Sequence, residues 1–128
     1  MTLLQTSAAL LLALGMVAPV AAQDLSPVGT WQTTTGESRY KVSLCGDGTQ
    51  LCAKLTWLRA DARTPKNLAM LNKLVVQNAK SIDENKWRGM VKYDGHEVSG
   101  SVTLVNANQM KLSGCQLVAC KQVDFVRL

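Results

Sequence analysis

The stretch SRYKVSLCGDGTQLCAKLTW, residues 38–57, holds two runs of alternating apolar and polar side chains around a short polar segment. Because successive side chains of a β-strand point to opposite faces, the alternation predicts two strands of one hairpin. Cys45 and Cys52 both fall on the lysine-bearing side. Directly opposed side chains on neighbouring strands lie about 5 Å apart, which a disulfide tolerates. The stretch therefore predicts a hairpin whose turn is closed by an outward-facing disulfide.

A second cysteine pair, Cys115 and Cys120, repeats this arrangement, because each lies on the polar face of its run. Four cysteines allow three connectivities, and the parity of the side chains favours Cys45–Cys52 and Cys115–Cys120. A cross-pairing such as Cys45–Cys115 stays open, because those side chains also face outward. Closing loops of this length stabilises the fold by roughly 2–2.5 kcal/mol each on the chain-entropy estimate. Paired cysteines in a small chain indicate an oxidising compartment.

The same alternation continues along the chain between turn signals, of which Asp94-Gly95 is the strongest. We expect an all-β fold, a small eight-stranded antiparallel up-and-down barrel, because closure of the sheet removes its exposed edges. A two-sheet sandwich is the alternative. One short helical turn is expected at 67–71, capping an end of the barrel. The expected strands are 28–34, 38–45, 51–57, 74–80, 87–93, 97–104, 110–115 and 120–125.

The N-terminal stretch differs from the rest of the chain. Residues 1–23 carry no charged side chain, and an apolar, alanine-rich block is followed by Pro19 and by Val20-Ala21-Ala22. This pattern predicts a signal peptide at 1–22 and a single β-barrel domain at 23–128. The alternative is a retained anchor, since a bilayer span needs ~20 apolar residues. We expect a periplasmic or secreted protein with no stable membrane anchor after signal cleavage.

Charge and residue pattern argue against several classes of function. The net charge of +5 comes from basic residues that appear singly, without the clustered stripe and interleaved aromatics of a nucleic-acid-binding surface. The cysteine pairs lack the close spacing of a structural zinc site, so no metal is expected. No cofactor is expected, and a glycine-rich phosphate loop is absent from the sequence.

An enzyme is also not expected. A Ser–His–Asp arrangement would have to use His96, the only histidine, which follows a tight turn. The carboxylates Asp83, Glu84, Asp94 and Glu97 lie at turns, where solvated side chains are the rule. The sequence therefore predicts no catalytic residue.

The barrel interior is the expected place for a binding site, because an eight-stranded barrel is either filled by side chains or holds one small ligand. A filled interior is favoured, because the strands are short. Inward glycines at 89, 100 and 114 either leave room or let strands bend. If a pocket exists, we expect Tyr40, Trp57, Trp87 and Tyr93 to line it. The full inward set adds Val42, Leu44, Ala53, Leu55, Val91, Val98, Val102, Leu104, Met110, Leu112, Val123 and Phe125.

The chain resembles known proteins at its two ends and at scattered structural positions. Gly29-Thr30-Trp31 and Arg127 resemble the signature of lipocalin-like, or calycin, barrels, in which a basic residue of the last strand covers a tryptophan of the first. Over residues 28–128 the chain also resembles the bacterial domain-of-unknown-function family 2147. The residues that carry this resemblance, besides Gly29-Thr30-Trp31, are Gly36, Cys45-Gly46, Leu51-Cys52, Trp57-Leu58, Trp87, Gly89, Tyr93, Leu112, Gly114-Cys115, Cys120 and Arg127. The resemblance implies small exported barrel proteins and gives Trp31 and Arg127 a structural role.

Two functions follow as hypotheses. The first is an exported, non-enzymatic barrel that binds a small apolar ligand or an envelope component. The second is a protein-interaction module, such as an inhibitor or an envelope stress protein, that uses exposed loops at 46–50 and 59–71.

Overall fold

The computed structural model describes residue 15 and residues 25–128, so the expected signal peptide and its cleavage site lie almost wholly outside the described residues. Among the described residues, no helix is long and apolar enough to cross a membrane. Two short helical segments lie between the third and fourth strands, η1 (Ala60–Ala62) and α1 (Pro65–Leu68). The strands are β1 (Gly29–Thr33), β2 (Ser38–Cys45), β3 (Gln50–Leu58), β4 (Leu74–Asp83), β5 (Lys86–Tyr93), β6 (His96–Asn106), β7 (Gln109–Gln116) and β8 (Ala119–Arg127).

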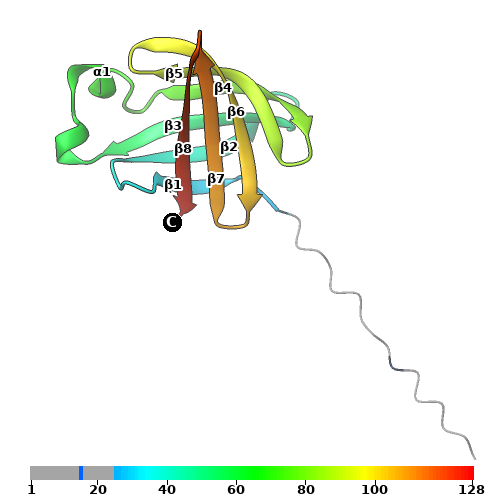
Figure 1. Cartoon of the computed structure of the whole chain (residues 1–128). Coiled ribbons are helices and arrows are strands. Elements are labelled where there is room, and N and C mark those ends of the chain that lie inside the picture. The colour runs from blue at the N-terminus through cyan, green and yellow to red at the C-terminus, as the bar shows by residue number, and fades with distance from the viewer. Residues whose placement is uncertain (1–14, 16–24) are drawn as a thin grey trace, which may run out of the picture.

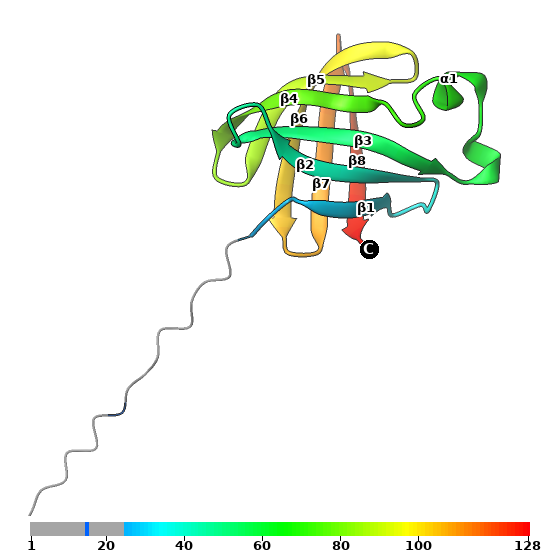
Figure 2. The same ribbon diagram turned by 180° about the vertical axis from the view of Figure 1, so that it is seen from behind.

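The eight strands form a closed barrel in which each strand pairs antiparallel with its neighbours in sequence. Pairing of β1 with β8, with Trp31 opposite Arg127 and Thr33 opposite Phe125, closes the sheet. Figures 1 and 2 show β2, β3 and β4 crossing β7 and β8 at a steep angle on opposite sides of the molecule. The predicted up-and-down barrel is therefore confirmed, and the two-sheet sandwich is excluded.

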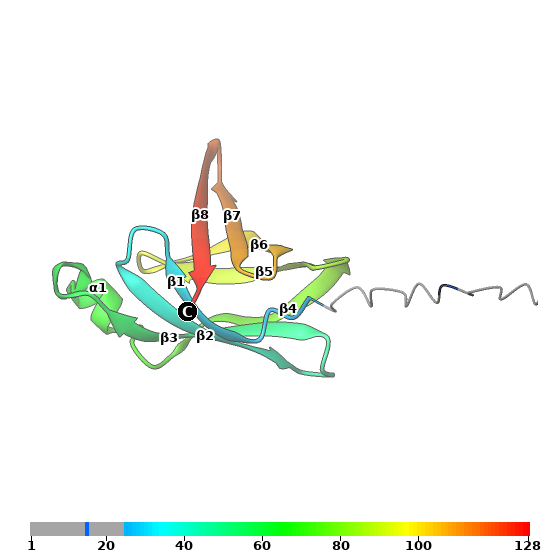
Figure 3. The ribbon, with the colours of Figure 1, turned by 90° about the horizontal axis from the view of Figure 1, so that it is seen from below.

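Alternation of strand direction gives the barrel two different ends. We call the end that holds the β2–β3, β4–β5 and β6–β7 turns, together with both termini of the barrel, the closed end. The other end, which we call the open end, carries the β1–β2, β5–β6 and β7–β8 turns and the long 59–73 segment with η1 and α1. The β7–β8 hairpin extends well beyond its neighbours there (Figure 3).

The closed end is packed around Trp31, which is completely buried. Its indole N–H donates to the Pro27 carbonyl at 2.8 Å, and the Arg127 guanidinium lies 4.3 Å from the ring centroid, within cation–π range. Gly29 leaves room for that guanidinium, since a Cβ there would lie 2.6 Å from Arg127 Nη1. Arg127 also donates to three backbone carbonyls, those of Ser26, Val28 and Ala107.

Both favoured disulfides are present, with Cα–Cα distances of 6.0 Å for Cys45–Cys52 and 4.0 Å for Cys115–Cys120. Cys115 and Cys120 are directly opposed in the register, as expected. Cys45 is opposite Gln50 instead, so the first pair is diagonal, and the expectation of opposed positions there was wrong. Cys52 is buried, and its sulfur accepts a hydrogen bond of 3.4 Å from the backbone N–H of Asn78 in the irregular strand β4.

A β-bulge in β3 changes which side chains face inward. Arg39 pairs with Trp57 while the next residue, Tyr40, pairs with Leu55, so Thr56 is an extra residue in β3. The extra residue reverses the alternation beyond it. Leu58 is therefore buried, and Trp57, expected inside, lies outside with the Arg39 guanidinium 4.3 Å from its ring centroid.

Two further expectations about local structure need correction. Leu44 was assigned to the inner face, but its side chain is largely exposed. It lies near the end of β2, next to the β2–β3 turn. The helical turn expected at 67–71 begins earlier, at Pro65, because the Thr64 hydroxyl caps it by accepting from the Asn67 N–H at 3.2 Å.

Candidate functional site

The barrel encloses a cavity of about 460 Å³ that opens at the open end. A volume of this size is typical of sites for small organic ligands. The expectation of a filled interior was therefore wrong. The physical reason is that three of the five large aromatic side chains assigned to the interior do not fill it: Trp57 is outside, Trp87 packs at the closed end, and Tyr93 is at the rim.

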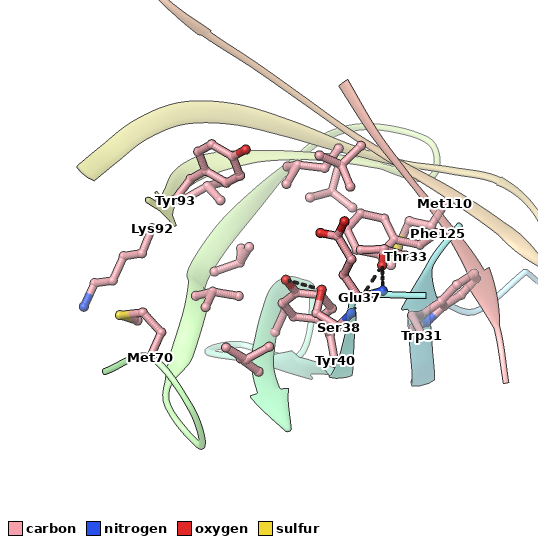
Figure 4. A pocket seen from close by; sticks show the side chains of 18 of the residues that line it. Trp31, Thr33, Glu37, Ser38, Tyr40, Met70, Lys92, Tyr93, Met110 and Phe125 are labelled. Carbon is pink, nitrogen blue, oxygen red and sulfur yellow. Dashed lines mark hydrogen bonds between the residues drawn. The ribbon is translucent and has the colours of Figure 1, made fainter. Parts of the chain in front are cut away.

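The wall of the cavity is mainly aliphatic and aromatic. Side chains from all eight strands contribute to it, and Tyr40 meets Phe125 edge to face with ring centroids 5.5 Å apart. Figure 4 shows Trp31, Met110 and Phe125 lining the same space as Tyr40, with Met70 of the 59–73 segment at its edge. An apolar ligand body would be transferred from water into an environment that offers dispersion contacts on all sides.

Several polar side chains interrupt this apolar wall near the β1–β2 turn, and we call three of them, Thr33, Ser38 and Tyr40, the hydroxyl cluster. The Ser38 hydroxyl donates to the Tyr40 hydroxyl at 3.0 Å. Thr33 Oγ1 accepts from the backbone N–H groups of Glu37 and Ser38 at 3.1 and 3.3 Å. Burial raises the pKa of the Tyr40 phenol, so it stays protonated and remains a hydrogen-bond donor.

The rim of the cavity is charged. Lys66 of α1 and Asp94 of the β5–β6 turn form an exposed ion pair at 3.7 Å, and both line the cavity opening. Arg59 braces the 59–73 segment, because it donates to both carboxylate oxygens of Asp61 at 2.6 and 2.8 Å and to the Thr35 carbonyl at 2.9 Å. The bonds between Arg59 and Asp61 lower the pKa of that carboxyl and raise the pKa of the guanidinium.

A second cavity of about 290 Å³ adjoins the first. It lies between the β5–β6 and β7–β8 hairpins and shares part of its wall with the main cavity, at Val91, Tyr93, Asp94, Leu112 and Val123. Gly100 belongs to the close strand packing there, since a Cβ would lie 2.9 Å from Val91 Cγ2, whereas a Cβ at Gly114 would make only ordinary contacts. Close strand packing at Gly100 was not expected, and the two expected purposes of the inward glycines stay predictions.

The structure separates the four aromatic residues assigned to a pocket. Tyr40 and Tyr93 line the main cavity. Trp87 faces inward but lies at the closed end, where its N–H donates to the Thr49 carbonyl at 2.9 Å. Trp57 lies on the outer surface.

Thr33 and Ser38 were not foreseen as site residues. Ser38 shares the inward parity of Tyr40, and that shared parity was a signal in the sequence that a hydroxyl cluster could form. His96, at the start of β6, lines the second cavity, not the hydroxyl cluster. Within residue 15 and residues 25–128, no group of acidic, histidine and cysteine side chains is placed to hold a metal ion.

The fold and the cavity define a class of protein, a small disulfide-bonded antiparallel β-barrel with an open apolar interior. Two disulfides indicate a protein that works outside the cytoplasm. The chain belongs to DUF2147, a family described as uncharacterized protein conserved in bacteria, whose sequence pattern matches residues 29–127. No curated protein and no solved structure matches the chain.

Proposed function

We propose that this protein is an exported, periplasmic binding protein that holds one small apolar ligand in its barrel. The observation that carries the proposal is the open cavity of about 460 Å³, whose wall is mainly apolar, with hydroxyl groups on one side and charged side chains also in its lining. Sites for small ligands have this composition, because burial of apolar surface supplies affinity and a few polar groups supply orientation.

The same geometry supports binding without chemical conversion. The only histidine lies on β6 beside the second cavity, away from the hydroxyl cluster. All four cysteines are held in disulfides, so none is a free nucleophile. The uncharged N-terminal stretch supports export to the compartment in which those disulfides form.

Between the two functions considered, the structure of the 59–73 segment favours ligand binding. Ala62, Asn67 and Met70 of this segment form part of the cavity wall. The Arg59 bonds to the Thr35 carbonyl and to Asp61 hold the segment against the β1–β2 turn. Because its side chains form part of the cavity wall, this segment is better suited to contacting a ligand in the cavity than to binding a protein partner.

Native mass spectrometry of the protein purified from its own periplasm tests this function. We expect a fraction of the molecules to carry one additional small-molecule mass, removable by organic solvent. The variant Val123→Trp, which adds bulk to the cavity wall, should lose that mass. The matched control Val126→Trp changes a valine of β8 that does not line the cavity, and it should keep the mass. A bound mass that persists in Val123→Trp, or no bound mass in the wild type, contradicts the proposal.

A further inference from the structure

The hydrogen bonds of the hydroxyl cluster are directional. The Tyr40 oxygen accepts the Ser38 proton at 3.0 Å, so that bond does not use the proton of Tyr40 itself. Thr33 Oγ1 accepts three hydrogen bonds, from the Thr35 hydroxyl at 3.2 Å and from the backbone N–H groups of Glu37 and Ser38. A hydroxyl has one donor and two acceptor sites, so the cluster presents spare donors to the cavity.

The Tyr40 hydroxyl lies in an environment where a hydrogen bond to a ligand contributes to affinity. Its ring packs edge to face on Phe125, and burial raises the pKa of its phenol, so the hydroxyl is largely removed from water. A donor in such an environment discriminates strongly between a ligand with an acceptor and one without, because its loss of water is otherwise uncompensated.

The charges around the cavity restrict the kind of acceptor. Three carboxylates line it, Glu37, Asp94 and Asp124, against the ammonium groups of Lys66 and Lys92. Lys66 is already paired with Asp94. Glu37 is near enough to Tyr40 to contribute to the raised pKa of the phenol. An anionic acceptor at the Tyr40 hydroxyl would meet the same repulsion, whereas a neutral one would not.

We propose that the Tyr40 hydroxyl is the anchoring donor for a neutral ligand, one with an apolar body and a carbonyl or similar acceptor oxygen. This inference rests on the proposed ligand-binding function. It adds the chemical class of the ligand and its orientation, with the acceptor oxygen toward the β1–β2 turn and the apolar body against Phe125 and the aliphatic wall.

A matched set of three probes tests the inference on the disulfide-bonded protein. The probes are 2-acetylnaphthalene, 2-ethylnaphthalene and 2-naphthoate, which share an aromatic body and differ in the acceptor. We expect the ketone to bind about three- to tenfold more tightly than the hydrocarbon, the factor that one hydrogen bond supplies. The carboxylate should bind more weakly than the ketone. In Tyr40→Phe the ketone should lose its advantage while the affinity for the hydrocarbon is unchanged. Tyr93→Phe, the matched control at the rim, should keep the advantage.

The outcomes separate this inference from the proposed function. If none of the three probes binds, the ligand-binding function itself fails. If ketone and hydrocarbon bind equally to the wild type, or if the ketone keeps its advantage in Tyr40→Phe, the function stands and the anchoring role is wrong. Tighter binding of the carboxylate overturns the requirement for a neutral ligand. The carbonyl ¹³C shift of labelled ketone bound to wild-type protein is a second measurement that needs no variant. We expect a downfield, hydrogen-bonded shift, and a shift equal to that in hydrocarbon solvent contradicts the anchor.

Discussion

The two ends of the barrel differ in how they use the same kinds of residue. At the closed end, Trp31 is fully buried between the Pro27 carbonyl and the Arg127 guanidinium. At the open end, Tyr93 is about half exposed, with Lys121 Nζ 5.3 Å from its ring centroid. An aromatic ring with a cation above it thus seals one end and leaves the other accessible. The comparison teaches that the stability of this fold and its binding capacity reside in different places.

The two disulfides show the same contrast. Cys45–Cys52 lies at the closed end, with Cys52 buried and the adjoining turn tied to the core by the Trp87 bond to the Thr49 carbonyl. Cys115–Cys120 lies on the projecting β7–β8 hairpin, whose tip residues Leu117 and Val118 are 97% and 101% exposed. One disulfide is part of the core, and the other stiffens a free-standing hairpin.

The largest difference between the ends should appear on removal of their aromatic rings. Trp31→Ala is expected to lower the free energy of unfolding by about 3–5 kcal/mol, because it leaves a cavity and uncovers Arg127. Tyr93→Ala, the control at the open end, should cost about 1 kcal/mol or less, since its ring is already half in water. Urea denaturation of both variants measures this, and equal losses would remove the distinction between the ends.

The disulfides provide the next largest effect. Paired Cys→Ala substitution at 115 and 120 should cost about 2 kcal/mol, the closure entropy of so short a loop. The same change at 45 and 52 should cost about 1 kcal/mol more, because buried sulfur contacts of Cys52 are lost as well. Thermal melts of the two double variants compare these values. A greater loss at the projecting hairpin contradicts this account of the two ends.

A smaller effect is expected from the Tyr40 phenol. Its pKa in the folded protein is raised above the ordinary value of 10.0 by burial, so the unfolded chain releases this proton first as the pH rises. Its contribution to stability is complete below pH 10 and is lost as the pH rises from there through the folded pKa. Unfolding free energies of wild type and Tyr40→Phe between pH 8 and 11 should therefore converge at the alkaline end. Parallel curves would show that the phenol is not buried in solution.

The smallest change in stability should follow loss of the rim ion pair. Lys66→Ala removes an exposed contact with Asp94 and is expected to change the free energy of unfolding by no more than about 0.5 kcal/mol. Ligand exchange should become faster, because the pair spans the opening between α1 and the β5–β6 turn. Stopped-flow binding of a naphthalene probe measures the rate. An unchanged rate in Lys66→Ala would separate this ion pair from control of access.

Much of the fold was predictable, because its signals are local. Alternation with a period of two predicts strands and places each cysteine on a face, and Asp94-Gly95 supplies the two positive-φ residues of a hairpin turn. Because the predicted strands are joined mostly by short turns, neighbouring strands must pair antiparallel, and only a few sheet topologies remain possible. The contact of Arg127 with Trp31 was implied by resemblance, and the structure shows it.

The site was less predictable, because it depends on nonlocal features. The bulge at Thr56 is a matter of register between two strands, and it alone moves Trp57 from the inside to the outside. The volume of the cavity is the volume that the barrel encloses minus the volume that its side chains fill. No single residue reports that difference, so the sequence did not reveal that the interior is open. Thr33 and Ser38 become a cluster only when the β1–β2 turn folds back on itself.

Binding of an apolar molecule inside the barrel is the central claim, and a ¹⁵N-edited NMR titration with 2-acetylnaphthalene tests it most directly. We expect saturable shifts at a stoichiometry of one, concentrated on amides of residues that line the cavity, such as Val42, Leu55 and Val91, with the β4–β5 and β6–β7 turns unaffected. Shifts confined to the exposed tip at Leu117 and Val118, or no saturable shifts at all, would contradict the claim.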